Sequence, residues 1–401
     1  FLITIMAVTL LLLGFFVGSA FGGINGGFIG LIIASAVWLG MTVFSFYSGD
    51  QVLLMASNAK EVTHEVHPQL FNIVEEMTIA ANLSKMPKIY IINEQAPNAF
   101  ATGRNPDHAA VAVPAGLLAR LNRDELQGVI AHEISHIIHR DILFVTMAGV
   151  MLGAIVIISQ IFLRGMFYSS MGSRRRYSSS SSNNGQAQLI LMVVAIICAI
   201  LAPIFAHIMY FALSRKREYL ADAGAVRLTR YPTGLADALH KISSNASPMK
   251  SANKVTAPMY ITNPLDSVKK TMAAKSSGKA SLFSTHPPID KRIEVLRKMS
   301  RGASFQDYSD SYRQTVGSDD PIPKSELKQS EAVGLRNASK DTAPKQQQKD
   351  PARQVGDIMR MVNGFVFLTC TCGLKMKIPP NFKSKKIKCP RCKKISDLPK
   401  K

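Results

Sequence analysis

The sequence predicts a mainly α-helical membrane protein with four apolar helices, an α+β domain and a small cysteine-containing module near its C-terminal end. Hydrophobic residues make up 47% of the 401 residues, and much of this content lies in four long apolar runs before residue 214. An apolar run of about 20 residues is long enough to cross a bilayer as a helix. Shorter segments with helix and strand periodicity separate the runs, which predicts a folded domain beside the membrane.

The first two apolar runs lie in residues 1–49, which contain no charged residue. The glycine-rich stretch from Gly22 to Gly27 divides them and is typical of a tight connection. We therefore expect a transmembrane hairpin over 1–49. A signal peptide is the alternative for the first run, but a second apolar run follows at once and no A-x-A cleavage pattern separates the two.

The other two runs, Ile142 to Leu163 and Leu189 to Leu213, predict a second apolar hairpin over 142–213. A buried hairpin in the core of the folded domain is the alternative. Two polar or reactive side chains lie in the last run. We expect His207 to have a local hydrogen-bond partner and Cys198 to contribute to packing.

Residues 50–300, which include the second hairpin, are expected to form the folded domain. A helical pattern begins at His67-Pro68, and Lys88 to Ile92 and Ala109 to Val113 resemble strands. Residues 301–363 are rich in Ser, Asp, Gln and Lys and are expected to be a flexible linker. Residues 364–401 form the C-terminal module.

One helix carries the main chemical motif. It is expected between Asn122 and Asp141, with Asn122 and Glu125 as a capping box, and it contains the HExxH sequence from His132 to His136. Residues four apart share one face of a helix, so His132 and His136 can bind the same ion while Glu133 enters the same cleft. This pattern indicates a catalytic zinc site of the gluzincin type.

A catalytic zinc takes three protein ligands and leaves one position open. Glu218 is the best candidate for the third ligand, because the return of the 142–213 hairpin would bring it beside the two histidines. Asp222, one turn later, could accept a hydrogen bond from a ligand histidine and fix its tautomer. The alternative is an exposed pair of carboxylates that has no metal.

Three further residues are candidates for the chemical step. Glu133 is predicted to act as the general base that takes a proton from the attacking water. A donor for the developing oxyanion is also expected, and His286 and Arg292 are candidates. The alternative for His286 and Arg292 is a loop histidine and a helix arginine in surface ion pairs.

Together these motifs resemble the HtpX family of membrane zinc metallopeptidases, which are related to the prenyl-protein endopeptidases. The resemblance rests on the HExxH motif, the Asn98-Ala99-Phe100-Ala101 stretch, the Glu218 region and His286-Pro287-Pro288, and it covers about residues 1–300. It implies that Glu218 is the third zinc ligand and that Asn98, Ala99 and Phe100 lie on a substrate-binding edge. From the sequence alone, Asn98 could equally be a turn residue.

The C-terminal module contains Cys370, Cys372, Cys389 and Cys392, arranged as two knuckles of a zinc ribbon. We expect a second, structural zinc here; two disulfides are the alternative. From Cys370 onward the sequence contains eleven Lys and Arg residues and one Asp, so about half of the net charge of +21 lies in this module. Its partner is unknown: nucleic acid, a ribosome or anionic lipid would fit, and a simply solvated tail is the alternative.

The resemblance also implies a function and a location. We expect a stress-response endopeptidase of the cell inner membrane, multi-pass, that degrades misfolded or damaged membrane proteins, with the bilayer and polypeptide substrates as partners. Its active site and the C-terminal module would face the cytoplasm. Positive charges are balanced on the two sides of the 142–213 hairpin, so charge alone does not decide this orientation. A site-specific processing protease and a membrane-anchored adaptor are the alternative functions.

Overall fold

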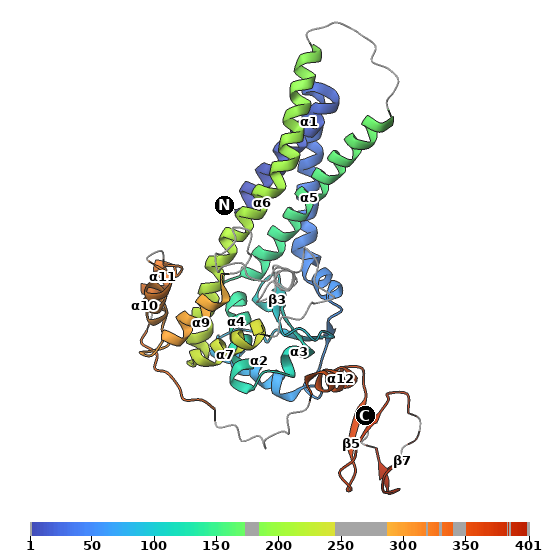
Figure 1. Ribbon diagram of the computed structural model, residues 1–401, viewed down its shortest axis with the longest axis vertical. Helices are drawn as coiled ribbons and strands as arrows, with labels where there is room; N and C mark the ends of the chain where they lie inside the picture. The colour runs from blue at the N-terminus through green and yellow to red at the C-terminus, as the bar shows by residue number, and fades with distance from the viewer. Residues whose placement is uncertain are drawn as a thin grey trace.

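The computed structural model describes residues 2–172, 184–244, 287–317, 320–328, 331–339, 350–382, 384 and 386–398. The described chain is mainly helical and has three parts along its long axis (Figure 1). Long helices extend from one end of a compact mixed domain, and a pair of small two-stranded sheets lies at the other end.

The first long element, α1 (Leu2–Ala56), is a hairpin of two helical arms. The break lies at Gly22 and Gly23, and Gly23 has a φ of 58°, a conformation that glycine adopts without strain. Glycines let the arms touch: a Cβ added at Gly30 would lie 2.1 Å from the carbonyl oxygen of Gly14. The two arms of the predicted hairpin over residues 1–49 are therefore in direct backbone contact, which their glycines allow.

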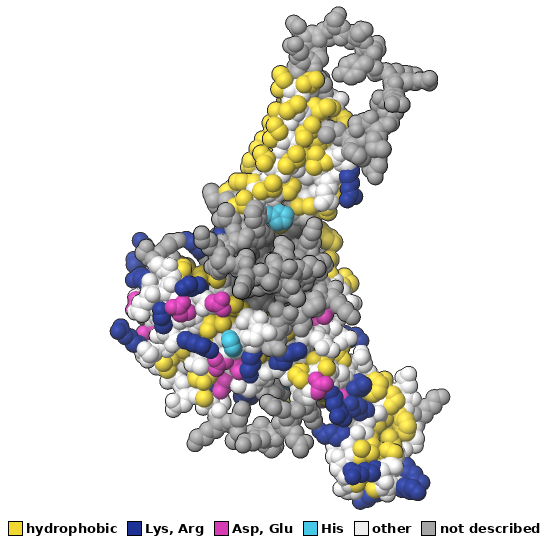
Figure 2. Space-filling view, viewed as in Figure 1, with side chains coloured by type: hydrophobic (Ala, Val, Ile, Leu, Met, Phe, Trp, Pro, Cys, Tyr) yellow, Lys and Arg dark blue, Asp and Glu magenta, His cyan; other side chains and the backbone are white. Residues whose placement is uncertain are grey.

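Two further long helices complete this end of the molecule. They are α5 (Asp141–Gly172) and α6 (Asn184–Thr229), and a common apolar cluster packs them against α1. Among the described residues, Ile3–Ala56 and Leu189–Ile208 are long and apolar enough to cross a membrane, and Met151–Gly165 is a shorter apolar stretch. The outer surface of the bundle is hydrophobic, whereas charged side chains gather on the compact domain (Figure 2).

The compact domain contains a four-stranded sheet in the order β1-β2-β4-β3. The central strands β2 (Lys88–Ile92) and β4 (Ala109–Pro114) are parallel, while β1 (Lys60–Glu61) and β3 (Phe100–Gly103) join the two edges antiparallel. In the part of the chain that the structure describes, β3 pairs only with β4. Helices α2 (Pro68–Ala80), α3 (Ala115–Leu118), α7 (Pro232–Ser244) and α9 (Ile289–Lys298) and the 3-10 turn Pro106–His108 complete the domain.

The HExxH motif lies on α4 (Arg123–Ile138), as the sequence predicts. The capping box is present: the Asn122 side chain accepts from the backbone N–H of Glu125, and the Glu125 carboxylate accepts from the backbone N–H of Asn122. Most residues of this helix are buried, and it packs against β3, α6 and α7. Because α4 is surrounded, its side chains keep a fixed direction.

The expectation of a flexible linker over residues 301–363 is wrong for much of that segment. Helix α10 (Phe305–Thr315) buries Phe305, Tyr308 and Tyr312 in the core of the compact domain. The polar composition of the segment concealed this apolar face, whose members recur at helical spacing. Helices α11 (Lys324–Lys328) and α12 (Pro351–Val362) follow, and α12 packs against α3.

The C-terminal module consists of two antiparallel hairpins. One pairs β5 (Val366–Thr369) with β6 (Lys375–Ile378), and the other pairs β7 (Lys386–Lys388) with β8 (Ile395–Asp397). The Lys377 ammonium forms an ion pair with Asp357 of α12, so the module is attached to the domain through that helix. It lies at the opposite end of the molecule from the apolar helices (Figure 1).

Candidate active site

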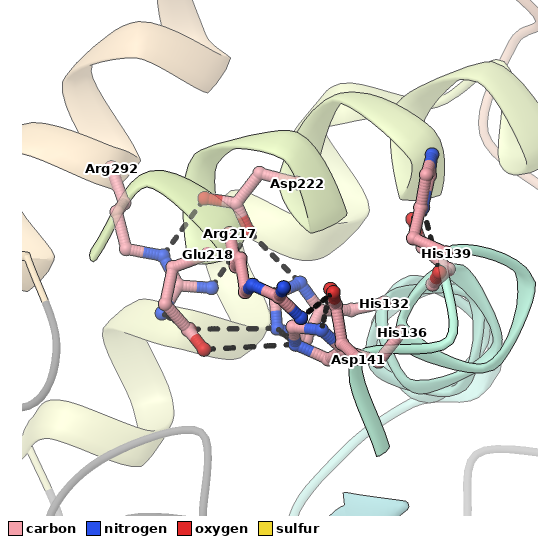
Figure 3. A network of polar contacts seen from close by, with 9 residues as sticks. His132, His136, His139, Asp141, Arg217, Glu218, Asp222 and Arg292 are labelled. Atoms are coloured by element: carbon pink, nitrogen blue, oxygen red, sulfur yellow. Dashed lines mark hydrogen bonds and ion pairs between the residues drawn. The ribbon is translucent and has the colours of Figure 1, made fainter. Parts of the chain in front are cut away.

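Three side chains from two helices converge beside the base of the apolar bundle. The Nε2 atoms of His132 and His136 on α4 lie 3.3 Å apart. Glu218 of α6 places one carboxylate oxygen 3.7 Å from Nε2 of His132 and the other 3.6 Å from Nε2 of His136. The predicted return of the hairpin thus brings Glu218 to the histidines (Figure 3).

These separations fit a zinc ion. With zinc–nitrogen and zinc–oxygen bonds of about 2.0–2.1 Å, the ligand atoms of a tetrahedral site lie about 3.3 Å apart. Burial lowers the pKa of the His132 imidazole, but the nearby carboxylates of Asp222 and Glu218 outweigh this effect and raise it to about 9. The pocket therefore favours a cation, and its two imidazoles and one carboxylate are a donor set that zinc commonly takes.

Each histidine has a carboxylate partner on its other ring nitrogen. Nδ1 of His132 lies 3.0 Å from a carboxylate oxygen of Asp222 on α6, and Nδ1 of His136 lies 3.0 Å from Asp141 with the geometry of a hydrogen bond. Such a contact holds the ring with Nδ1 protonated and leaves Nε2 free to bind a metal. Both Nε2 atoms point toward Glu218 (Figure 3).

Arg292 of α9 contacts the carboxylates of Glu218 and Asp222. Its side chain is 1% exposed, and its guanidinium donates to Asp222 at 2.7 and 2.8 Å and to Glu218 at 2.9 Å. These two carboxylates raise the pKa of Arg292 despite the opposing effect of burial. The guanidinium thus faces the carboxylates, which differs from the expected role as an oxyanion donor.

Glu133 is buried between α4 and the edge strand β3. Burial raises the pKa of its carboxyl group, whereas the charges of His132 and His136 and a hydrogen bond from the backbone of Ala101 lower it, and burial prevails. A carboxylate with a raised pKa is a better proton acceptor near neutral pH. Its neighbour Ala101 belongs to β3, so Glu133 lies beside this strand of the sheet.

Residues 65–300, more than half of the chain, match the family described as Peptidase family M48. The chain belongs to peptidase family M48. Similar proteins include the Protease HtpX homolog of Dictyoglomus turgidum, which is 47% identical over 273 residues, or 68% of this chain and 83% of the relative. No solved structure matches the chain significantly.

Two other relatives lead to the same conclusion. The Protease HtpX homolog of Listeria monocytogenes strain EGD-e is 46% identical over 298 residues, which cover 72% of this chain and 95% of the relative. That of Caldanaerobacter subterraneus is 40% identical over 276 residues, or 69% and 87%. The predicted resemblance to the HtpX family is therefore confirmed, and this M48 protein is a membrane zinc metalloprotease.

The predicted substrate-binding stretch lies where β3 begins, but its side chains face inward. Asn98, Ala99 and Phe100 are all buried, and Phe100 belongs to an apolar cluster with Leu54 and Ile92. Asn98 accepts a hydrogen bond from the backbone N–H of Ala99 at 3.1 Å. His286 lies outside the described residues.

Asp141 and Arg217 are not among the site residues that the sequence predicts. In the sequence Asp141 only marks the end of the HExxH segment, whereas in the structure it contacts both His136 and Arg217. The signal in the sequence is an acidic residue five positions after a predicted ligand histidine and at the start of the next helix. His207, by contrast, has the expected local contact: its Nδ1 lies 2.7 Å from the carbonyl oxygen of Pro203.

A second cluster lies in the C-terminal module. The sulfur of Cys370 lies 3.4 Å from that of Cys392, and the sulfur of Cys372 lies 3.7 Å from that of Cys389. All four thiols are free, and their ligand atoms lie within 4.8 Å of one another. For zinc–sulfur bonds of about 2.3 Å, tetrahedral geometry places sulfurs about 3.8 Å apart. The cluster could therefore hold a second metal ion.

Proposed function

We propose that this membrane metalloprotease cleaves misfolded or damaged membrane proteins close to the bilayer, as part of a stress response. The observation that carries the proposal is the position of the site at the base of the apolar bundle. Residue His136 is five positions before the start of α5, and Glu218 is ten positions after the apolar stretch Leu189–Ile208. A chain that leaves the bilayer would thus be within reach of the site.

We infer that a substrate binds as extended polypeptide close to β3, because Ala101 of this strand lies next to Glu133. Main-chain hydrogen bonds are the usual contacts between an extended peptide and a strand. Because the side chains of Asn98, Ala99 and Phe100 are buried, contacts from this stretch would depend little on the sequence of the substrate. Such tolerance suits a protease that degrades many different damaged proteins.

The residues of the site would have different roles in catalysis. His132, His136 and Glu218 would hold the zinc, which when bound supplies Lewis acidity toward the scissile carbonyl. Glu133 would take a proton from the attacking water and deliver it to the leaving amine. The carboxylates behind the histidines fix the rings during this step. The oxyanion donor is left unassigned, with His286 as the remaining candidate.

We propose a multi-pass arrangement in which the two arms of α1, together with α5 and α6, form four membrane-crossing helices. The common apolar cluster and the hydrophobic outer surface of this bundle support it. The active site and the C-terminal module would face the cytoplasm of a cell inner membrane, where four reduced thiols can hold zinc. A cysteine introduced at Ser244 tests the orientation: labelling by an impermeant reagent in intact cells would contradict it.

The four cysteines would hold a second, structural zinc. Metal analysis of the full chain should then give two zinc ions, and one after removal of residues 364–401. The exposed cations Lys375, Lys388 and Arg391 favour an added binding role toward an acidic partner, for which nucleic acid is one candidate. A full chain with a single zinc would contradict the structural metal.

The proposed substrate class is tested by trapping. Glu133→Gln keeps the three predicted ligands but removes the base, so substrates should bind without being cut. The variant is expressed in cells, and the proteins that co-purify are compared with those retained by His136→Ala, which lacks a ligand. Enrichment of many membrane proteins supports the proposal, whereas one dominant partner cut at one site would favour a processing protease.

A further inference from the structure

Asp141 lies at the junction between the metal-binding helix and the apolar bundle. Helix α4 ends at Ile138, and α5 begins at Asp141, so only two residues separate them. One of these, Arg140, has a φ of 56°, which turns the chain sharply at this point. The turn directs the buried Asp141 carboxylate back toward α4, where Oδ2 lies 3.0 Å from Nδ1 of His136.

The other oxygen of Asp141 is engaged by the second bundle helix. Oδ1 forms an ion pair with the guanidinium of Arg217 on α6 (Figure 3). The same guanidinium lies over the ring of Phe144, with 3.8 Å from its central carbon to the ring centroid. Asp141 and Phe144, one turn apart on α5, therefore hold Arg217 between them. Arg217 directly precedes the predicted ligand Glu218 in the chain.

We propose that Asp141 is a positioning residue for His136 and that Arg217 holds the Asp141 carboxylate in place. The zinc site is then complete only when the start of α5 is packed against the Arg217 segment of α6. This inference rests on the assignment of His132, His136 and Glu218 as metal ligands. Asp141 contacts a ligand from α4, and Arg217 is adjacent to a ligand from α6. The Asp141–Arg217 pair thus connects the two ligand-bearing helices where they enter the bundle.

The chemistry of the contact explains why the pair affects metal binding. A carboxylate that accepts a hydrogen bond from Nδ1 fixes the imidazole tautomer, orients the ring and increases the basicity of Nε2. Loss of such a partner commonly lowers metal affinity by about 10- to 100-fold. Without Arg217, the Asp141 side chain loses its second anchor, and we expect a smaller decrease of about 3- to 10-fold.

The test is the zinc affinity of the site formed by His132, His136 and Glu218, measured in the full chain in detergent by competition with a chromogenic chelator. Asp141→Ala should weaken zinc binding by at least 10-fold, and Asp141→Asn, which keeps the shape of the side chain, by a smaller factor. Arg217→Ala alone should weaken zinc binding. In the double variant with Asp141→Ala, it should weaken zinc binding no further than Asp141→Ala does alone. The matched control is Asp237→Asn, which removes a carboxylate from an exposed ion pair with Arg297 and should leave the affinity unchanged.

A spectrum separates positioning from general loss of structure. In the cobalt-substituted protein, Asp141→Asn should shift the visible bands of the histidine site, while the bands of the four-thiolate module stay the same. Zinc affinity within twofold of the normal value in both Asp141 variants would overturn the proposal, as would independent effects of the Asp141 and Arg217 changes. Unchanged affinity in His136→Ala would instead overturn the metal assignment, and with it the role of Asp141.

Discussion

Replacing Arg292 with methionine removes the cation that lies between two carboxylates of the active site. Its guanidinium is 1% exposed and donates three hydrogen bonds of 2.7–2.9 Å to Asp222 and Glu218. Removing one partner of a buried ion pair costs about 3–5 kcal/mol, because the other charge stays buried without compensation. For a domain of roughly 240 residues, this cost lowers the unfolding midpoint by about 6–20 °C.

Zinc should reduce this loss of stability. A bound zinc ion supplies positive charge to Glu218, so one of the two carboxylates left by Arg292→Met is compensated in the zinc-loaded protein. We therefore expect the variant to be destabilised more strongly with a chelator than with zinc. The measurement is the helical circular dichroism signal of the full chain in detergent, followed with rising temperature in both conditions.

Arg297 offers a matched control on the same helix. It is 54% exposed and forms a single ion pair with Asp237 at 3.4 Å, so Arg297→Met should change stability by less than about 1 kcal/mol. If Arg292→Met and Arg297→Met shift the midpoint equally, Arg292 is not the buried counter-charge described above. An equal shift with chelator and with zinc would contradict the link between Arg292 and the metal site.

Two further changes test other parts of the structure. Gly30→Leu should destabilise the α1 hairpin, because a Cβ there would lie 2.1 Å from the Gly14 carbonyl oxygen. Gly40→Leu should not, because the space around Gly40 is open. The yield of cross-links between cysteines placed in the two arms measures whether the arms stay in contact. For Asp124, burial raises the pKa but hydrogen bonds and the charge of Arg336 lower it below the ordinary value of 3.8. The contacts of Asp124 therefore add stability above about pH 4, and this stability is lost as pH falls through the lower folded pKa. Protection from hydrogen exchange near Arg336, relative to the intrinsic exchange rate, should fall in that range, and Arg336→Ala should weaken the pH dependence, because the hydrogen bonds from Ser339 remain.

Features encoded by neighbouring residues could be predicted from the sequence. The HExxH helix carries two predicted ligands, the predicted base and the capping box within about 20 residues, and the structure places these residues on α4 or at its N-cap. Glu218 is distant in sequence, but the two apolar runs limited the possible return path of the chain. A hairpin that starts beside the histidines must also end beside them.

Features set by tertiary contacts could not be predicted in the same way. Asp141 resembles an ordinary acidic residue in the first turn of a helix, and only the turn at Arg140 reveals its contact with His136. The sequence makes Arg292 a candidate oxyanion donor, but the direction of its guanidinium, toward Glu218 and Asp222, depends on how α9 packs against α6. The average composition of residues 301–363 predicts a linker, because it conceals the apolar face of α10, which appears only in the spacing of its apolar residues.

We propose that peptide hydrolysis depends on Glu133 beside a zinc ion held by His132, His136 and Glu218. The most direct test compares casein cleavage by the full chain and by Glu133→Gln in detergent, with the zinc content measured in the same preparations. We predict equal zinc content and cleavage slower by at least about 100-fold in the variant. Cleavage by Glu133→Gln at the rate of the unaltered chain would contradict the assignment of the base and of the active site.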